Sequence, residues 1–359
     1  MKISYFLKKI QDVTFNDYLE LLPMVCGFGI SLFCKKKYCN TWLICEDPFE
    51  AHDNGYHFFK YLREKQPQID VYYAIKKEAR EYKKVASLGK VIHYGSVKHW
   101  ILYFNGKYNI SSQKGGKPNA ALCAFFELNH IFKPHNIFLQ HGVIINDLEW
   151  LHADKTILDL FITSSVDEQR FIQDTFGFDK NIIVRTGLPR FDNLHTFSYN
   201  KNRIVIMPTW RKWLRLKSEK NTQLDMNFEV SEFIERWLSL LDSDELQQII
   251  EKYNLEVIFY PHRQMQKHIR DFVCKNSKVI IASSDDYDIQ DLLKSAKLLI
   301  TDYSSVFFDM VYMKKPVIFY QFDEERFRKY HYAKGYFDYN DNPFGKAYNN
   351  HLDVIKALE

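Results

Sequence analysis

Residues 298–305, with the sequence LLITDYSS, decide the fold of this chain. The first four, 298–301, are apolar or β-branched and predict a strand that is buried inside a sheet. The strand stops at Asp302, and Ser304 and Ser305 then open a helix, because serine is favoured at helix N-termini. A strand that passes at once into a helix is the repeating unit of α/β proteins with parallel sheets.

Short apolar runs that precede a turn and a helical period recur along the whole chain. Ser165 and Glu168 form a capping-box pattern that predicts a helix to about Phe176, and other helical patterns cover 57–64 and 228–253. The expected strands are 41–45, 69–75, 91–94, 108–111, 137–140, 160–163 and 182–185, followed by 204–207, 257–260, 279–282, 298–301 and 317–320.

A polar stretch near the middle of the chain divides these elements into two sets. Residues 195–202, HTFSYNKN, have the composition of a linker. A chain of 359 residues is long enough for two domains, each with its own core. We therefore predict an α/β protein with two Rossmann-like domains, residues 1–198 and 199–359, which face a cleft. The last helix is able to cross back to the first domain.

The composition is that of a globular protein and narrows the function classes. A net charge of +4 provides no global field for a nucleic-acid partner, although residues 201–220 hold seven Lys or Arg against one Glu. Aromatic residues reach 16%, which indicates either aromatic-rich cores or a face that meets lipid or a long acceptor. The six cysteines lack metal-site spacing, so we expect reduced thiols and no structural zinc.

Residues 19–34 form an apolar stretch that meets three lysines, Lys35, Lys36 and Lys37. The stretch is shorter than the roughly 20 residues of a membrane-spanning helix, and Pro23 interrupts it. Two interpretations stay open, a segment that lies in an anionic membrane interface and a buried first helix. We expect no secretory signal, because no cleavage-site pattern follows.

In open α/β sheets, ligands bind beyond the carboxyl ends of the strands, so these ends are where we look for chemistry. The hydroxyls and backbone N–H groups of Ser304 and Ser305 suit a diphosphate, although serines also simply cap helices. Asp302 at the strand tip could meet a ribose or fix Ser304. Neither GxGxxG nor a P-loop motif occurs, which removes the main support for a dinucleotide or P-loop site.

Two histidines, one in each half, also follow expected strands. His141 lies between Gln140 and Gly142, where glycine permits an unusual turn, and its imidazole could take a proton from a hydroxyl nucleophile. His262 follows Pro261 and could neutralise a phosphate or protonate a leaving group. The competing interpretation for His141 is a structural histidine, hydrogen-bonded in the seam between the domains.

Three polar or cationic side chains at other strand ends are further candidates. Thr209 and Arg211, in the sequence PTWR, offer a hydroxyl and a planar cation that suit phosphate. The basic residues that follow could contact lipid head groups or a polyanion, or form a solvated loop. Arg190 could serve an anionic group or pair with Asp192 in its turn.

Taken in order, these motifs resemble the CDP-glycerol glycerophosphotransferase family of bacterial wall and capsule polymer synthesis. The resemblance covers nearly the whole chain and is most specific at 301–309, TDYSSVFFD, and 315–320, KPVIFY. Three sites depart from the family pattern: Gln140 replaces a common Trp, Val143 replaces Thr, and the order Pro261-His262 is reversed. Further matching segments are 53–62, 69–75, 140–142, 176–178, 187–192 and 208–211.

The resemblance implies a GT-B fold with the acceptor bound mainly by the first domain and a CDP-linked donor by the second. It assigns catalysis to His141 and His262. On the acceptor side it places Asp53, Asn54, Gln140, Gly142 and Arg190, and on the donor side Thr209, Arg211, Thr301, Asp302, Ser304 and Ser305.

We therefore expect a transferase that moves glycerol phosphate from CDP-glycerol to a hydroxyl of a lipid-linked or polymer acceptor and releases CMP. Such an enzyme of teichoic-acid-like or capsule synthesis would be cytoplasmic and peripheral on the inner face of the cell membrane. The alternatives are ribitol-phosphate transfer, sugar transfer from a nucleotide, and a non-catalytic polymer-binding module. No cofactor is indicated, and a divalent metal stays open, since no DxD-type carboxylate cluster ends a strand.

Overall fold

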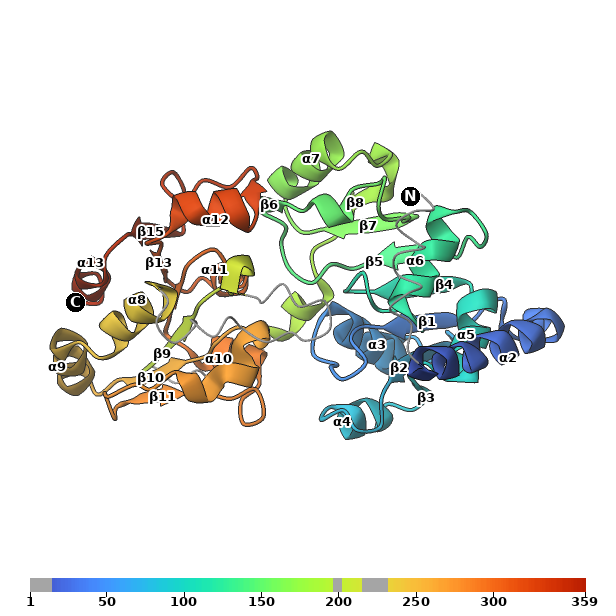
Figure 1. Ribbon diagram of the computed structural model, residues 1–359, viewed down its shortest axis with the longest axis horizontal. Helices are drawn as coiled ribbons and strands as arrows, with labels where there is room; N and C mark the ends of the chain where they lie inside the picture. The colour runs from blue at the N-terminus through green and yellow to red at the C-terminus, as the bar shows by residue number, and fades with distance from the viewer. Residues whose placement is uncertain (1–14, 196–201, 215–231) are drawn as a thin grey trace. The chain divides into compact units, whose positions relative to one another are not determined.

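The computed structural model describes residues 15–195, 202–214 and 232–359, and the chain forms two compact units (Figure 1). The first unit comprises residues up to His141 together with Glu149–Arg190, and the second comprises Gly142–Leu148 and Phe191–Glu359. The sequence placed the boundary at 198/199, so the observed division falls a few residues earlier. Most of the expected linker, 196–201, lies outside the described residues.

The first unit is built on a seven-stranded parallel sheet with the order β3-β2-β1-β4-β5-β7-β8. The strand order reverses between β1 and β4, as in Rossmann-like sheets. Its strands are β1 (Trp42–Cys45), β2 (Val71–Ile75), β3 (Val91–His93), β4 (Tyr108–Ser111), β5 (Asn136–Phe138), β7 (Leu160–Thr163) and β8 (Ile183–Arg185).

Side chains of this sheet alternate between two hydrophobic cores, because successive strand residues point to opposite faces. Ile44 packs with Phe59 of α3, whereas its neighbour Leu43 packs with Trp100 of α5. The helices of the unit are α2 (Phe15–Tyr38), α3 (Asn54–Lys65), α4 (Tyr82–Ala86), α5 (Val97–Asn105), α6 (Ala120–Leu128) and α7 (Val166–Thr175).

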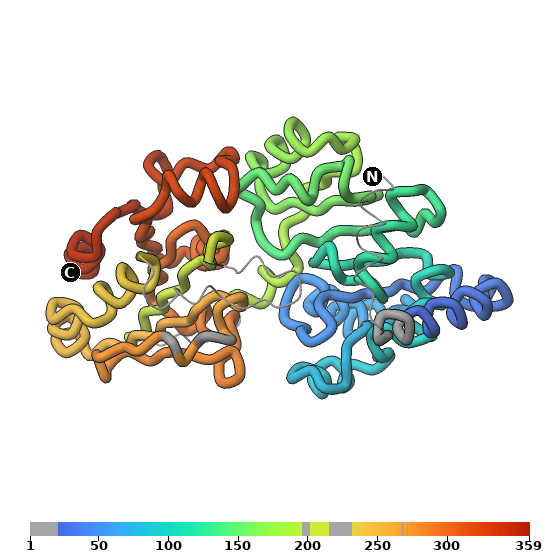
Figure 2. The backbone as a smooth tube through the Cα atoms, in the orientation of Figure 1, coloured from blue at the N-terminus to red at the C-terminus, as the bar shows by residue number. Residues whose placement is uncertain are grey.

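The second unit repeats this topology with a six-stranded parallel sheet in the order β11-β10-β9-β12-β13-β15, and Figure 2 traces its course. Here the order reverses between β9 and β12. Its strands are β9 (Arg203–Met207), β10 (Glu256–Phe259), β11 (Val279–Ile281), β12 (Leu298–Thr301), β13 (Val317–Tyr320) and β15 (Gly345–Tyr348), and its helices are α8 (Glu232–Leu241), α9 (Asp244–Tyr253), α10 (Ile289–Ser295), α11 (Phe307–Tyr312), α12 (Glu324–Tyr330) and α13 (His351–Lys356).

Every strand expected from the sequence is present, with ends shifted by at most two residues. The expected cap at Ser165 is confirmed, because its hydroxyl accepts a hydrogen bond from the backbone N–H of Glu168 at 3.2 Å; the Glu168 carboxylate accepts the N–H of Ser164 rather than that of Ser165. The sequence missed β15 and a short antiparallel pair, β6 (Asn146–Asp147) with β14 (Ala333–Lys334). These strands lack the apolar runs that marked the others.

Two expected helices differ in their bounds. The pattern at 228–253 divides into α8 and α9, because Ser243 caps a new helix through the N–H of Leu246; residues 228–231 lie outside the described part. The helix expected from Ser304 begins only at Phe307, and Ser304 and Ser305 lie in the turn before it.

The apolar N-terminal stretch forms α2, which continues through Pro23; in residues 21–38, Gly27 and Ser31 are buried and most other residues are exposed or partly exposed. Gly27 faces Trp100 of α5 so closely that a Cβ there would lie 2.5 Å from the Trp100 Cβ. Leu32 is 65% exposed and Phe33 90% exposed, so the interpretation as a buried first helix is wrong. No helix within the described ranges is both long and apolar enough to cross a membrane.

Candidate active site

In each unit, polar side chains gather where the strand order reverses. Glu46 and Ser112 follow β1 and β4 in the first unit, and Thr209 and Asp302 follow β9 and β12 in the second. Loops that leave neighbouring strands at this point diverge to opposite faces of a sheet and leave space for a ligand. We describe the two clusters separately.

The first cluster is organised by the carboxylate of Asp53, which is 4% exposed. Its Oδ1 accepts the backbone N–H of Asn54 at 2.8 Å, so it caps the start of α3. Its Oδ2 contacts Nδ1 of His141, whose side chain is 68% exposed. The imidazole is therefore held by one nitrogen, and its Nε2 is the nitrogen left to act on another molecule.

Arg190 completes this cluster from the loop after β8. Its Nη1 lies 2.9 Å from Oδ1 of Asp53 and also donates to the backbone carbonyl of His141. The sequence left open a pair with Asp192 or a free anion-binding role; the structure instead pairs Arg190 with Asp53. At 7% exposure the guanidinium is a buried support for the Asp53–His141 pair.

These charges shift the pKa values of both partners in opposite directions. Burial alone would raise the pKa of Asp53, but the charge and hydrogen bond of His141, the Arg190 charge and the Asn54 N–H lower it to about 2. The Asp53 charge raises the pKa of His141 above its ordinary value of 6.5, against burial and Arg190. The raised pKa of His141 stabilises the fold fully below pH about 6.5, and this contribution is lost as the pH rises through the folded-state value.

A second buried carboxylate, Glu46, lies behind Asp53 and was missed by sequence analysis. Its side chain accepts hydrogen bonds from the Tyr56 N–H at 3.0 Å, the Tyr73 hydroxyl at 2.8 Å and the Ser112 hydroxyl at 3.0 Å. Gly55 is required beside it, because a Cβ would lie 2.8 Å from Glu46. The sequence did contain a signal that could have identified Glu46, because it is an acidic residue directly after the buried strand β1.

Gln140 and Asn54 shape the backbone around His141 and are not open to an acceptor. Gln140 is 0% exposed, adopts a left-handed φ of 65°, and donates from Nε2 to Glu168 at 3.1 Å. Asn54, also 0% exposed, donates to the Gln140 carbonyl at 2.8 Å and accepts the Arg190 N–H at 3.0 Å. The unusual turn expected at Gly142 therefore falls on Gln140, and only His141 and Gly142 of these residues reach the surface.

In the second unit, Arg211 is buried between two aspartates. It lies 2.8 Å from Asp302 and 2.7 Å from Asp323, with its side chain 0% exposed. Its guanidinium also lies 5.1 Å from the ring of Tyr303. Two carboxylates neutralise this cation and keep it from solvent, so it is not the exposed phosphate ligand that the sequence indicated.

Asp302 and Thr301 are likewise engaged inside the unit. Asp302 accepts the backbone N–H of Thr209 at 2.8 Å and of Tyr303 at 2.6 Å, and the Thr301 hydroxyl donates to the Met207 carbonyl at 2.6 Å. Both residues are 0% exposed. They join the ends of β9 and β12, and so position the turn that carries Ser304 and Ser305.

Among the buried polar atoms near this turn, Arg328 Nε and His331 Nε2 have no hydrogen-bond partner in the part of the chain that the structure describes. The Arg328 guanidinium lies 5.7 Å from the Tyr303 ring and donates to Asn146 at 2.7 Å. Sequence analysis did not select Arg328, since nothing distinguishes it from the other basic residues of α12. Buried polar groups are nearly always paired, so unpaired ones suggest a ligand.

In both His262 and His331, the Nδ1 atom accepts a backbone N–H. His262 caps the 3-10 helix Arg263–Asp271, where its Nδ1 accepts the Gln264 N–H at 3.1 Å, and the Nδ1 of His331 accepts the Lys212 N–H at 2.9 Å. Burial, then Arg211 and His262, lower the pKa of His331 to about 3. The neutral His331 ring therefore carries its proton on Nε2 and is a hydrogen-bond donor.

Within the described ranges, no group of three or more His, Cys, Asp or Glu side chains is arranged to hold a metal ion. The described cysteines form no disulfide, as expected for reduced thiols. Of the basic stretch at 201–220, residues 201 and 215–220 lie outside the described part.

Comparison with known proteins gives a consistent picture. The family described as CDP-Glycerol:Poly(glycerophosphate) glycerophosphotransferase matches residues 28–359. The minor teichoic acid biosynthesis protein GgaB of Bacillus subtilis is 34% identical over 332 residues, which cover 89% of this chain and 35% of that protein. The teichoic acid poly(ribitol-phosphate) polymerase of Bacillus spizizenii is 24% identical over 98% of this chain and 55% of its own length.

Among solved structures, the wall teichoic acid polymerase TagF is similar, with a TM-score of 0.64 at 15% identity over 100% of this chain and 89% of that chain. At this identity the likeness concerns the fold alone, and it confirms the α/β, GT-B-type class expected from the sequence. The chain spans about a third to a half of the length of the curated relatives named above.

We predict that Asp53→Asn lowers the pKa of His141 toward 6.5, because the carboxylate is the main cause of its elevation. An NMR titration of the histidine ring signals measures this shift. Asp159→Asn is the matched control, since it removes a carboxylate that lies 3.6 Å from another exposed histidine, His135. This variant should leave the pKa of His141 unchanged. An unchanged His141 pKa in Asp53→Asn contradicts the assignment.

We also predict that Arg211→Met lowers the free energy of unfolding by about 3–5 kcal/mol, because it leaves two buried carboxylates without their cation. Denaturant unfolding measures the loss. In the control Arg236→Met, which removes a half-exposed pair with Glu232, the change is about 0.5 kcal/mol or less. Equal losses in the two variants are the result that refutes a structural Arg211.

Proposed function

The chain belongs to the CDP-glycerol:poly(glycerophosphate) glycerophosphotransferase family, and from this premise we propose that it transfers an alditol phosphate from a CDP-alditol to an acceptor hydroxyl. Glycerol phosphate is the expected cargo, and the acceptor is a lipid-linked or polymeric chain of teichoic-acid-like or capsular type. The observation that carries the proposal is the exposed imidazole of His141, held at Nδ1 by the buried Asp53.

His141 is the general base of the proposed reaction. Its Nε2 takes the proton of the acceptor hydroxyl as the oxygen attacks the phosphorus that bears the alditol. A new P–O bond forms, the bond from that phosphorus to the bridging oxygen breaks, and CMP leaves with the electron pair. The proton passes from His141 to solvent or to the product, which restores the base.

Asp53 supports this step in two ways. Its contact with Nδ1 fixes the tautomer in which Nε2 is free, and its charge stabilises the imidazolium that forms when the proton is taken. Arg190 keeps Asp53 ionised and holds the backbone of His141 through its carbonyl. Glu46, Asn54 and Gln140 position this group from behind without touching substrate.

The donor diphosphate is proposed to bind at the turn after β12. Ser304 and Ser305 offer hydroxyls and backbone N–H groups there, and Arg328 supplies the cation that the buried Arg211 cannot. The Nε2–H of His331 is a donor that suits the charge that develops on the leaving phosphate, and His262 is proposed to act on the same phosphate. Thr209 adds a buried hydroxyl next to Asp302, while Arg211, Thr301 and Asp302 act as positioning residues.

The membrane surface is the proposed place of action. Along α2, Leu22, Val25, Leu32 and Phe33 are each more than half exposed, and Lys35–Lys37 follow at its C-terminal end. An apolar side next to cations fits the interface of an anionic membrane. A peripheral position on the inner face would bring the first unit close to a lipid-linked acceptor.

Nucleotide release tests the proposed reaction. Wild-type protein is incubated separately with CDP-glycerol, CDP-ribitol and a UDP-sugar in the presence of a glycerol-phosphate polymer, and we expect CMP from a CDP-alditol. His141→Ala should lower this rate about 100- to 10,000-fold and leave CDP-glycerol affinity within about twofold, because the general base acts on the acceptor. His135→Ala is the control, since His135 is equally exposed beside a carboxylate.

Normal turnover in His141→Ala removes this residue from the mechanism. Release of CDP or UDP supports a sugar transferase instead, and polymer binding without any nucleotide release supports a non-catalytic module. CMP release from CDP-ribitol but not CDP-glycerol identifies ribitol phosphate as the cargo.

Donor affinity tests the second cluster. The double variant Ser304→Ala/Ser305→Ala and the variant Arg328→Gln should each raise the Kd for CDP by roughly tenfold or more, the loss typical of hydrogen bonds to a charged group. Arg326→Gln on the same helix, an exposed residue against Trp213, serves as the control. Isothermal titration calorimetry measures all four proteins, and unchanged affinity in both variants rules out this phosphate site.

A further inference from the structure

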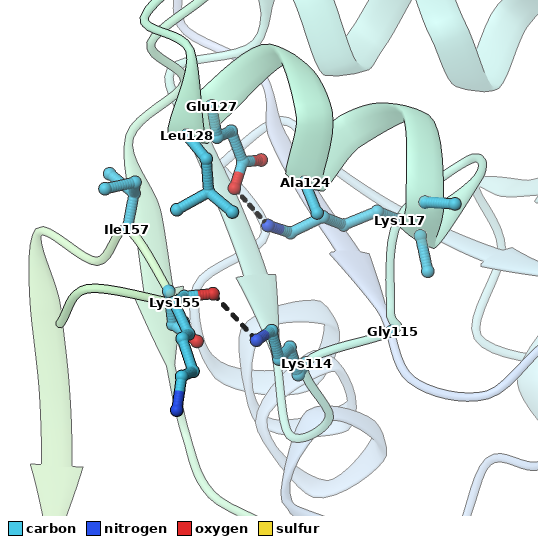
Figure 3. Close-up of a pocket in the computed structure, with 11 residues that line it drawn as sticks. Lys114, Gly115, Lys117, Ala124, Glu127, Leu128, Lys155 and Ile157 are labelled. Atoms are coloured by element: carbon cyan, nitrogen blue, oxygen red, sulfur yellow. Dashed lines mark hydrogen bonds and ion pairs between the residues drawn. The ribbon is translucent and has the colours of Figure 1, made fainter. Parts of the chain in front are cut away.

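The first unit contains a separate cavity of about 400 Å³ that the proposed reaction does not use (Figure 3). Three parts of the chain line it: the loop after β4, one side of α6, and the segment before β7. Its lining includes Lys114, Lys117, Ala124, Glu127, Lys155 and Ile157. A volume of this size falls in the range of small-ligand sites.

Lys114 is fixed at the cavity in an unusual way. Its ammonium donates to the backbone carbonyls of Trp150 at 2.6 Å and Lys155 at 2.8 Å. An ammonium has three N–H donors, so one remains for a ligand after these two contacts. The cation is held in place by neutral carbonyls, and its charge is not cancelled by a carboxylate contact.

Lys117 enters the cavity from the same loop and meets Glu127, which is 2% exposed (Figure 3). The other oxygen of Glu127 accepts the Tyr103 hydroxyl at 2.7 Å, so this carboxylate is fully engaged. The residues that line the cavity include three lysines, Lys114, Lys117 and Lys155, and one carboxylate, so their net charge is positive. Burial and then the nearby Lys117 charge lower the pKa of Lys114, a cost that a bound anion would offset.

The rest of the wall is apolar and made of small side chains. Ala120, Ala121 and Ala124 of α6 leave the space open, and Leu128 and Ile157 close its end. No aromatic ring lines the cavity, so nothing there would stack on a nucleobase. The lining suits a ligand that combines one compact anion with a short carbon skeleton.

Topology relates the cavity to His141. The lysine loop follows β4 and the His141 loop follows β5, and these strands are parallel neighbours with Ser111 opposite Phe138. Both loops therefore leave the same edge of the sheet. A chain-like acceptor whose terminal hydroxyl reached His141 could place an earlier unit in the cavity.

We infer that this cavity is an acceptor subsite for one phosphodiester of a polyol- or sugar-phosphate chain. The phosphate lies on Lys114 and Lys117, and the adjoining carbon skeleton lies on the alanine wall of α6. This inference rests on the proposed function for the identity of the chain, but the binding chemistry follows from the cavity itself.

The test uses glycerophosphoglycerol, a phosphodiester with a glycerol on each side, and measures its binding to the full chain by calorimetry. Lys114→Gln should raise its Kd roughly tenfold or more, as expected for a lost charge-assisted contact. Ala124→Phe should abolish binding by filling the cavity without a change of charge. Lys155→Gln should leave the Kd within about twofold, because its ammonium points away from α6 in Figure 3 and pairs with Glu149.

Equal Kd values of the wild type and Ala124→Phe for the diester overturn the subsite. If the wild type binds inorganic phosphate as tightly as the diester, the claim that the cavity wall binds the carbon skeleton is wrong. CDP affinity and CMP release from CDP-glycerol are measured on the same proteins. Diester binding that is lost in Ala124→Phe, in a protein that releases no CMP, supports the subsite and defeats the proposed reaction. If the wild-type protein releases CMP but neither cavity variant changes the affinity for the diester, the proposed reaction is supported and the subsite is refuted.

Discussion

The buried carboxylate of Asp53 is the constraint on which the first unit's chemistry depends. It caps the start of α3 and is paired with an imidazole from the loop after β5 and a guanidinium from the loop after β8. Loops that follow three strands, β1, β5 and β8, therefore converge on one charge. A buried anion is tolerated only when it is paired and hydrogen-bonded, and here the pairing also orients His141. In the proposed reaction, the stability of the unit and the reactivity of His141 therefore depend on the same interaction.

The second unit also contains a buried charge that is paired with oppositely charged side chains, but here the central group is a cation. Arg211 is a buried cation held by Asp302 and Asp323, and this group ties β9 and β12 to α12, where Arg328 lies. Because Arg211 is neutralised, the groups that remain for a ligand are those without partners in the described chain, Arg328 Nε and His331 Nε2 among them. The buried ion pairs of Arg211 hold the strand ends together, whereas the unpaired donors of Arg328 and His331 are the groups that we propose for ligand binding.

The fold was predictable because its strands are buried on both sides and read as short apolar runs, as at 298–301. Strand β15, with the sequence GKAY, carries no such run and was missed. Within the site, the position of His141 followed from its place after a strand, but its partner Asp53 lies 88 residues away. For Arg211 the sequence showed a cation beside a strand end; which carboxylates neutralise it depends on residues about a hundred positions later.

The most direct measurement of the central claim is the pH dependence of kcat/KM for CMP release. If His141 is the base held by Asp53, kcat/KM falls at low pH with an apparent pKa that equals the His141 value from NMR and lies above 6.5. A rate that is independent of pH across this range, or a fall at a pKa that differs from that of the His141 ring, would contradict the account.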